Sequence, residues 1–177
     1  MPAVRPCALP DQALLRKHRD AGAYTDCFVT EVPGVVSHRA FVEAFYTTPL
    51  FKLERALLSL FANRPSTDAQ ARQWAMGDAD RFSAWHVESR CTDQLLVAFG
   101  RTRSWFMVSP AGDGSGAAGV TRLYFGSAVI PRSSPHGGRP DMGFGFAALQ
   151  GFHKLYSRAL LAAARSRLRA SGAGSAA

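Results

Sequence analysis

Apolar and polar residues alternate one by one in four stretches in the second half of the chain, at residues 82–89, 94–100, 103–109 and 120–130. A period of two predicts β-strands. An earlier strand is expected at residues 23–32, where the alternation ends at Pro33-Gly34. Because the later strands are joined by turns and loops too short to hold a crossover helix, they are expected to pair antiparallel. The pattern therefore predicts an antiparallel sheet of about five strands.

Two amphipathic helices are expected directly after the first strand. Ser37 is a suitable N-cap for a helix over residues 39–47, and Thr48-Pro49 supplies the N-cap and first position of a helix over residues 50–61. A third, weaker helix is expected to end at Gly77. The sequence thus predicts a pair of helices inserted between the first strand and the rest of the sheet.

A long helix is predicted over residues 144–168, with an apolar stripe on one side and basic residues on the other. The stripe needs a partner surface, so the fold class we predict is α+β, with the sheet wrapped on this C-terminal helix. The residues expected in the stripe are Gly145, Leu149, Phe152, Tyr156, Ala159, Leu160 and Ala163.

A chain of 177 residues with 47% hydrophobic content is expected to form one domain with tails. Residues 1–22 are punctuated by proline and charge, which predicts an extended N-terminal arm with one short helical turn near residues 12–17. Residues 23–169 form the predicted domain. Residues 170–177 are small and are expected to be a disordered tail.

Several classes of protein are disfavoured by what the sequence lacks. It has no apolar run long enough for a membrane span and no apolar signal-type region near the start, so a cytoplasmic location is expected. The three cysteines, Cys7, Cys27 and Cys91, are odd in number and widely spaced, which argues against a disulfide framework and a zinc site. Cys27 is expected to be a small buried hydrophobic residue. No metal and no cofactor are predicted.

The net charge of +8 arises entirely after residue 93, where Asp113 and Asp141 are the only acidic residues. Such an asymmetry fits either an anionic partner or a solvated helix face in an arginine-rich chain. The lack of a lysine-rich run and of a known aromatic signature does not favour nucleic acid as the partner. The sequence does not set the oligomeric state.

Alternate residues of the predicted strands place arginine beside aromatic residues on one face of the sheet. Arg101, Arg103 and Trp105 share a strand face, and Arg122 and Tyr124 share the matching face of the next strand. If this face lined a cavity, its guanidinium groups would suit a carboxylate or phosphate. The alternative is an outward face on which Glu88 and the arginines form cross-strand pairs.

His153 is predicted on the flank of the long helix, one turn before Tyr156. A histidine and a tyrosine at the rim of a pocket can supply general acid–base chemistry, so these two are the candidate catalytic residues. The alternative is a boundary histidine with a satisfied hydrogen bond.

Four segments resemble an uncharacterised bacterial family of the START-like (helix-grip, SRPBCC) superfamily, members of which are sometimes fused to short-chain-dehydrogenase-like domains. The segments begin at Tyr24 (YTDCF), Trp85 (WHVESRCTDQLL), Thr121 (TRLYF) and Gly151 (GFHKLY). The resemblance implies a curved sheet that wraps the terminal helix and leaves a cavity between them. Superfamily members include both binding proteins and enzymes, so the fold does not choose a function.

The leading functional hypothesis is a domain that binds a small hydrophobic or amphipathic molecule between the sheet and the C-terminal helix. The alternatives are an enzyme of the cyclase, isomerase or hydrolase type in the same cavity, and an interaction module without a ligand. The residues expected to line the binding site are Trp85, Arg103, Trp105, Tyr124, Phe152 and Tyr156.

Overall fold

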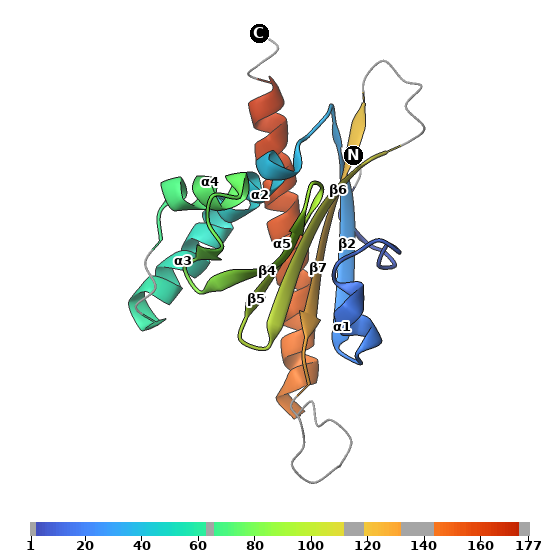
Figure 1. Ribbon diagram of the computed structural model, residues 1–177, viewed down its shortest axis with the longest axis vertical. Coiled ribbons are helices and arrows are strands. Elements are labelled where there is room, and N and C mark those ends of the chain that lie inside the picture. Colours follow the sequence, from blue (N-terminus) through green and yellow to red (C-terminus); the bar gives the residue numbers. More distant parts are fainter. Residues whose placement is uncertain (1–2, 63–65, 112–118, 132–143, 174–177) are drawn as a thin grey trace.

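The computed structural model describes residues 3–62, 66–111, 119–131 and 144–173, and places helices on both faces of one sheet (Figure 1). The strands are β1 (Arg5–Pro6), β2 (Tyr24–Pro33), β3 (Arg81–Phe82), β4 (Trp85–Cys91), β5 (Gln94–Phe99), β6 (Thr102–Pro110) and β7 (Val120–Val129). The helices are α1 (Arg16–Asp20), α2 (His38–Tyr46), α3 (Pro49–Ala62), α4 (Asp68–Met76) and α5 (Phe144–Ala173).

The sheet has seven antiparallel strands in the order β1-β2-β7-β6-β5-β4-β3. The first long strand, β2, pairs with the last, β7, along its whole length, from Tyr24 opposite Val129 to Pro33 opposite Val120. The α+β class is confirmed and a strand lies at each of the five expected places, but the predicted count of five is wrong, because the sheet also contains β1 and β3. Each of these is two residues long, which is too short for a period of two to be recognised.

The helix boundaries follow the capping signals. The Ser37 hydroxyl accepts a hydrogen bond from the Ala40 amide at 3.2 Å and begins α2. A reciprocal capping box between Thr67 and Gln70 begins α4, and Gly77, with φ of 94°, ends it. The predicted pair of helices after the first strand is therefore confirmed, as is the third helix that follows them.

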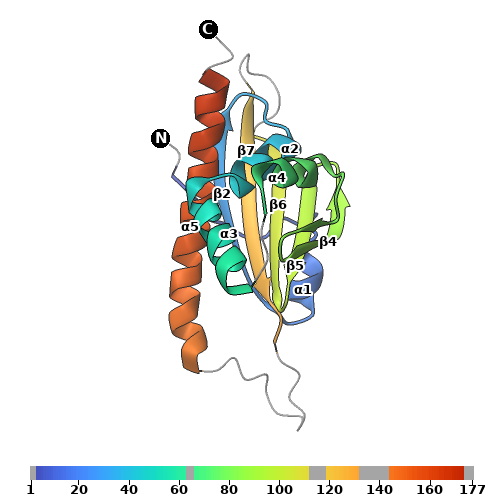
Figure 2. The same cartoon turned by 90° about the vertical axis from the view of Figure 1, so that its left-hand side faces the viewer.

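The two faces of the sheet are covered by different parts of the chain. Helices α2 to α5 lie on one face and α1 lies on the other (Figures 1 and 2). On the first face α5 runs along β2, while α2 packs on β6 and α4 reaches β3. No helix in the described ranges has the length and apolarity that a membrane crossing demands.

The main core lies between the sheet and helices α2 to α5 and is rich in aromatic rings. Phe45 of α2 is central to it, because its ring centroid lies 4.8 Å from those of both Phe106 and Phe125 on neighbouring strands. Tyr46 and Trp74 fill the space beside α4 and are almost completely buried. Rings in such offset or edge-to-face contacts add attraction beyond the area that they bury.

The N-terminal segment covers the opposite face of the sheet. Leu15 is fully buried there against Trp105 and Met107. The Gln94 side chain holds the segment, because its amide nitrogen donates to the Gln12 carbonyl at 3.0 Å and its oxygen accepts from the Leu14 amide at 3.0 Å. Residues expected to form an arm are thus a packed layer of the fold, and their helical turn lies at α1, a few residues later than predicted.

The buried side of α5 is rotated from the predicted stripe. Ala159, which was expected in the stripe, is exposed, whereas Ser157 is buried. The helix also continues to Ala173, into the expected tail, and residues 174–177 lie outside the described part of the chain. The burial of Gly145, Leu149 and Phe152, which were also expected in the stripe, lies outside the described part of the structure as well. The buried residues of α5 that the structure describes are Ser157, Leu160, Leu161 and Ala164.

Two glycines give opposite predictions for the same substitution. A Cβ at Gly126 would lie 3.0 Å from the Asp26 carbonyl oxygen and 3.1 Å from side-chain atoms of Leu15 and Trp105, so Gly126→Ala is expected to destabilise the fold by about 1–2 kcal/mol. A Cβ at Gly151 on α5 would meet nothing within 4 Å, so Gly151→Ala is expected to stabilise by about 1 kcal/mol. Urea denaturation of both variants measures the two effects, and equal shifts would contradict the close packing at Gly126.

Candidate functional site

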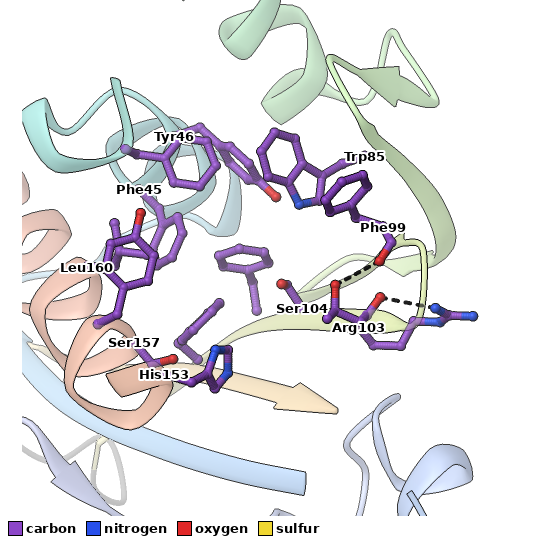
Figure 3. Close-up of a pocket in the computed structure, with 14 residues that line it drawn as sticks. Phe45, Tyr46, Trp85, Phe99, Arg103, Ser104, His153, Ser157 and Leu160 are labelled. Carbon is purple, nitrogen blue, oxygen red and sulfur yellow. Dashed lines mark hydrogen bonds between the residues drawn. The ribbon is translucent and has the colours of Figure 1, made fainter. Parts of the chain in front are cut away.

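A cavity of about 230 Å³ lies between the sheet and helices α2, α3 and α5. Figure 3 shows how it is enclosed, with Phe45 and Tyr46 from α2 on one side, Trp85 and Phe99 from the strands on another, and α5 along the remaining edge. The strands position the aromatic residues because alternate side chains of a strand point to the same face. The cavity therefore lies on the apolar face of the sheet, where α2 and α3 on one side meet α5 on the other.

The walls of the cavity are mainly aromatic. Phe51 from the first turn of α3 lies 5.2 Å from Trp85 between ring centroids, and Phe99 lies 5.8 Å from the same indole. Phe99 is 43% exposed, so this edge of the wall reaches solvent. Such a wall suits a planar apolar molecule, because ring faces and edges offer large contact area at low conformational cost.

Helix α5 gives the cavity a polar side. His153, Tyr156 and Ser157 line it from successive turns, next to Leu160. The Ser157 side chain is 1% exposed, and its hydroxyl has no hydrogen-bond partner among the described residues. A buried hydroxyl without a partner costs free energy, so a hydrogen bond with a ligand would be favourable at this position.

His153 is held by two groups from the middle of the sheet. Its Nε2 lies 2.7 Å from Ser127 Oγ, and that hydroxyl donates to Asp26 Oδ1 at 2.6 Å. Since the single hydroxyl proton goes to Asp26, Ser127 accepts from the Nε2–H of His153. Asp26 Oδ2 lies 3.8 Å from the same ring nitrogen. In neutral His153 the remaining lone pair is then on Nδ1, which gives the ring a site that can accept a proton.

Three of the predicted site residues, Trp85, Tyr156 and His153, line this cavity. Arg103 also borders it, but its side chain points away from the cavity (Figure 3). The guanidinium group donates to the carbonyls of Gly100 and Thr102, both at 3.0 Å, and pairs with Glu88. The side chain of Phe152 lies outside the described part of the chain.

Trp105 and Tyr124 lie on the other face of the sheet, under the N-terminal segment. The Trp105 indole nitrogen donates to the Gln94 side-chain oxygen at 2.8 Å. On the same face Arg122 pairs with Glu31 at 3.1 Å. The face that carries the arginines is therefore an outer face of the sheet with cross-strand ion pairs. This is the alternative that the sequence left open.

Glu88 on β4 collects three basic groups on this outer face. Lys17 and His18 from α1 lie 2.7 Å and 2.8 Å from Glu88 Oε1, and Arg103 pairs with the other oxygen. Burial by itself would raise the pKa of Glu88, but the hydrogen bonds from Lys17 and His18 and the charge of Arg103 outweigh it and lower that pKa to about 2. The cluster fastens α1 to the sheet.

Sequence reasoning missed several residues of the cavity. Phe45 and Phe99 were assigned to apolar faces without a role, and Ser157 has no local signal because a serine within a helix is usually solvated. Asp26 and Ser127 are 101 residues apart in sequence and meet only through the pairing of β2 with β7. Knowing that pairing would have been sufficient to find them.

The described residues contain no group of three or more His, Cys, Asp or Glu side chains that could hold a metal ion. A second hollow, of about 390 Å³, lies between residues 32–36 and the C-terminal part of α5, where Leu168 and Arg169 border it. The described residues that line it include neither aromatic rings nor a buried hydroxyl, so the aromatic cavity is the better candidate for a binding site.

Fold and site together define an α+β protein with a seven-stranded antiparallel sheet and an aromatic cavity beside its C-terminal helix. Comparison of the chain with protein-family models, with curated proteins and with solved structures finds no match.

Proposed function

We propose that the protein binds a small, mostly aromatic molecule with one uncharged polar group in the cavity between the sheet and α5. The observation that carries this proposal is the Ser157 hydroxyl, which has no hydrogen-bond partner among the described residues and is almost completely buried beside aromatic side chains. A ligand whose polar group meets Ser157 would recover the hydrogen bond that the free protein lacks.

The size of the cavity limits the ligand. Binding sites for drug-sized molecules measure roughly 300–1,000 Å³, whereas an apolar cavity of about 150 Å³ already takes up benzene. A cavity of about 230 Å³ lies between these cases. It suits a molecule with one or two fused rings.

The charge of the residues that line the cavity favours a ligand whose polar group is uncharged. Arg103 and His153 are the basic residues among the described lining residues, and the Arg103 guanidinium points away and pairs with Glu88. His153 is already hydrogen-bonded to Ser127. A carboxylate in the cavity would lose its hydration without gaining a cation, which is costly. A hydroxyl or an indole N–H would not meet this penalty.

The arrangement agrees with the START-like resemblance, which implies a ligand cavity between a curved sheet and a terminal helix. We accordingly extend the proposal to a helix-grip type of binding. The aromatic walls supply affinity, and the hydroxyl and imidazole of α5 fix the orientation of the ligand.

Ser157→Ala is expected to have opposite effects on stability and binding. Removing the unpartnered hydroxyl should raise the free energy of unfolding of the free protein by about 1 kcal/mol. The same change should weaken binding of 1-naphthol about fivefold, because the ligand hydroxyl loses its partner. Urea denaturation and isothermal titration calorimetry measure the two effects. Ser166→Ala, at an exposed serine of the same helix, corrects for helix propensity.

Matched ligands test the preference for an uncharged group. Binding of 1-naphthol is expected, with naphthalene weaker and 1-naphthoate weakest. Leu160→Trp, which fills the cavity from α5, should abolish binding while the circular dichroism spectrum stays unchanged. If 1-naphthol binds the Leu160→Trp variant as well as it binds the original protein, the cavity is not the binding site.

The Asp26–Ser127–His153 arrangement supports a second candidate function, general base catalysis on the bound molecule. The ring of His153 lines the cavity and is oriented by Ser127 and Asp26, as a general base requires. Hydrolysis of 1-naphthyl acetate, with water activated by His153, tests this candidate. The original protein should exceed the His153→Gln variant in rate at least tenfold. Equal hydrolysis rates in the original protein and in His153→Gln would contradict catalysis by His153 and leave ligand binding as the proposed function.

A further inference from the structure

Cys7 and Cys27 face each other across the strands β1 and β2. The register places Arg5 opposite Val29 and Pro6 opposite Phe28, so the next pair is Cys7 and Cys27. The Cys7 amide donates to the Cys27 carbonyl at 3.0 Å, and the two sulfur atoms lie 3.3 Å apart. Both cysteines are free in the structure.

The backbone pairing of the two cysteines is compatible with a disulfide. Directly opposed residues of a hydrogen-bonded antiparallel pair have Cα atoms about 5.5 Å apart, and disulfides span Cα separations of about 4.4–6.8 Å. The sulfur atoms need to approach by only about 1.2 Å to reach the bond length of about 2.05 Å. Small side-chain rotations supply this movement without a change of strand pairing.

The surroundings give the two sulfurs different roles. Cys7 is partly exposed, whereas Cys27 is 6% exposed, so an oxidant in solution reaches Cys7. The hydrogen bond between the two sulfurs lowers the pKa of Cys7 against the opposing effect of burial, and the charge of Arg5 lowers it further. That hydrogen bond and burial raise the pKa of Cys27. Cys7 is therefore the nucleophile, and Cys27 keeps its proton.

We propose that Cys7 and Cys27 are a redox pair that closes to a disulfide on reaction with hydrogen peroxide. The Cys7 thiolate attacks the O–O bond, taking one oxygen as a sulfenic acid and releasing the other as water after protonation. The Cys27 sulfur then attacks the Cys7 sulfur and forms the S–S bond, while the sulfenic oxygen leaves with the Cys27 proton as a second water. Two thiols are oxidised and one peroxide is reduced.

The bond would fasten the N-terminal segment to the sheet. The 20-residue separation between the two cysteines contains Ala13 and Leu15, which cover Trp105 on the outer face. In the reduced protein this segment is held by non-covalent contacts with Gln94 and Glu88. Closing the loop restricts the unfolded chain, so the oxidised protein is expected to melt roughly 6–12 °C higher than the reduced protein.

Peroxide treatment of the full chain followed by iodoacetamide tests the proposal. Intact mass should show one alkylated thiol, at Cys91, and the peptide map should link Cys7 to Cys27 until a reductant is added. The Cys91→Ser variant, which lacks the exposed third thiol, should form the same link and show the same rise in melting temperature. In Cys27→Ala, Cys7 should instead stop at the sulfenic acid, which dimedone labels.

Three results would overturn the proposal. One is alkylation of all three thiols after peroxide treatment, and another is a link through Cys91 in place of the Cys7–Cys27 link. The third is accumulation of dimedone-labelled Cys7 in the original protein as in Cys27→Ala, because the second sulfur would then take no part. Equal melting temperatures of linked and reduced protein would overturn the stabilising role of the bond.

Discussion

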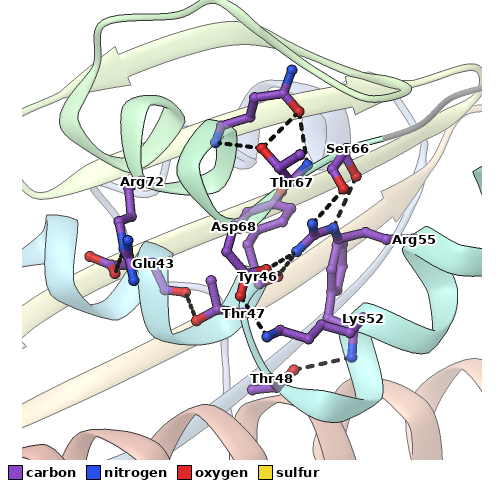
Figure 4. Close-up of polar contacts among 12 residues, drawn as sticks. Glu43, Tyr46, Thr47, Thr48, Lys52, Arg55, Ser66, Thr67, Asp68 and Arg72 are labelled. Carbon is purple, nitrogen blue, oxygen red and sulfur yellow. Dashed lines mark hydrogen bonds and ion pairs between the residues drawn. The ribbon is translucent and has the colours of Figure 1, made fainter.

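Replacing Arg55 with alanine is expected to lower the free energy of unfolding by about 3 kcal/mol, because one buried guanidinium group joins three elements. Arg55 on α3 is 7% exposed and donates to the Ser66 carbonyl and to Asp68 Oδ1, both at 2.7 Å (Figure 4). It also donates to Ser66 Oγ and to the Tyr46 carbonyl at the end of α2. Alanine would leave these acceptors without their donor.

Asp68 is the first residue of α4, and its carboxyl takes part in the same contact. Hydrogen bonds from Lys52 and then from Arg55 lower the pKa of Asp68, and Lys52 would remain at 2.5 Å in the variant. The loss therefore arises mainly from the carbonyl groups of Ser66 and Tyr46 and from the contact of the guanidinium with the Phe82 ring, 5.6 Å away. We expect the cost to appear as a lower urea midpoint at unchanged slope.

Arg72→Ala is the matched control for Arg55→Ala. Arg72 on α4 pairs with Glu43 on α2 at 3.0 Å, but its side chain is 57% exposed (Figure 4). An exposed ion pair contributes less than about 1 kcal/mol, so this variant should remain close to the original protein. Equal losses in the two variants would contradict the assignment of Arg55 as a buried link between α2, α3 and α4.

Acidification from about pH 7.5 to about pH 4 is expected to remove about 3 kcal/mol of stability through His38 alone. His38 begins α2 and is 9% exposed, and its Nε2 has no hydrogen-bond partner within the described ranges. Burial lowers the pKa of His38 from 6.5 to about 4. A nearby Asp93 and a hydrogen bond with the Phe106 backbone oppose this shift, and Arg90 adds to it.

Acidification lowers the free energy of unfolding because the unfolded state takes up the proton first. The unfolded chain protonates His38 near pH 6.5, but the folded protein does so only near pH 4. Between these values the unfolded state binds more protons, so stability is complete above pH 6.5 and is lost as the pH falls. Glu88, whose pKa is lowered to about 2, adds a separate loss below about pH 4.5.

His38→Gln should flatten the stability curve between about pH 6.5 and pH 4, because glutamine does not titrate. Urea denaturation at several pH values measures the curve. His86→Gln is the control, since His86 is an exposed histidine of β4 and its replacement should leave the slope unchanged. A slope that persists in His38→Gln would assign the acid sensitivity to other groups.

The alternation of side chains identified which residues share a face, but not which face is covered by which element. Trp85 and Trp105 were both expected at one ligand site, yet the structure places them on opposite faces of the sheet. The prolines and charged residues of the N-terminal segment suggested that it was an extended arm. In fact the adjacent Leu14 and Leu15 cover the outer face, so that both faces of the central strands are buried.

The capping residues and the two periodicities of the sequence determined the α+β class, the order of the helices and the five long strands, because these signals act within a few residues of the chain. Only the tertiary structure decided the contacts that depend on strand register and on helix rotation. It paired β2 with β7, which joins Asp26 to Ser127, and β1 with β2, which joins Cys7 to Cys27. It also turned Ser157 into the cavity, because the packing of a whole helix against the sheet sets which of its sides is buried.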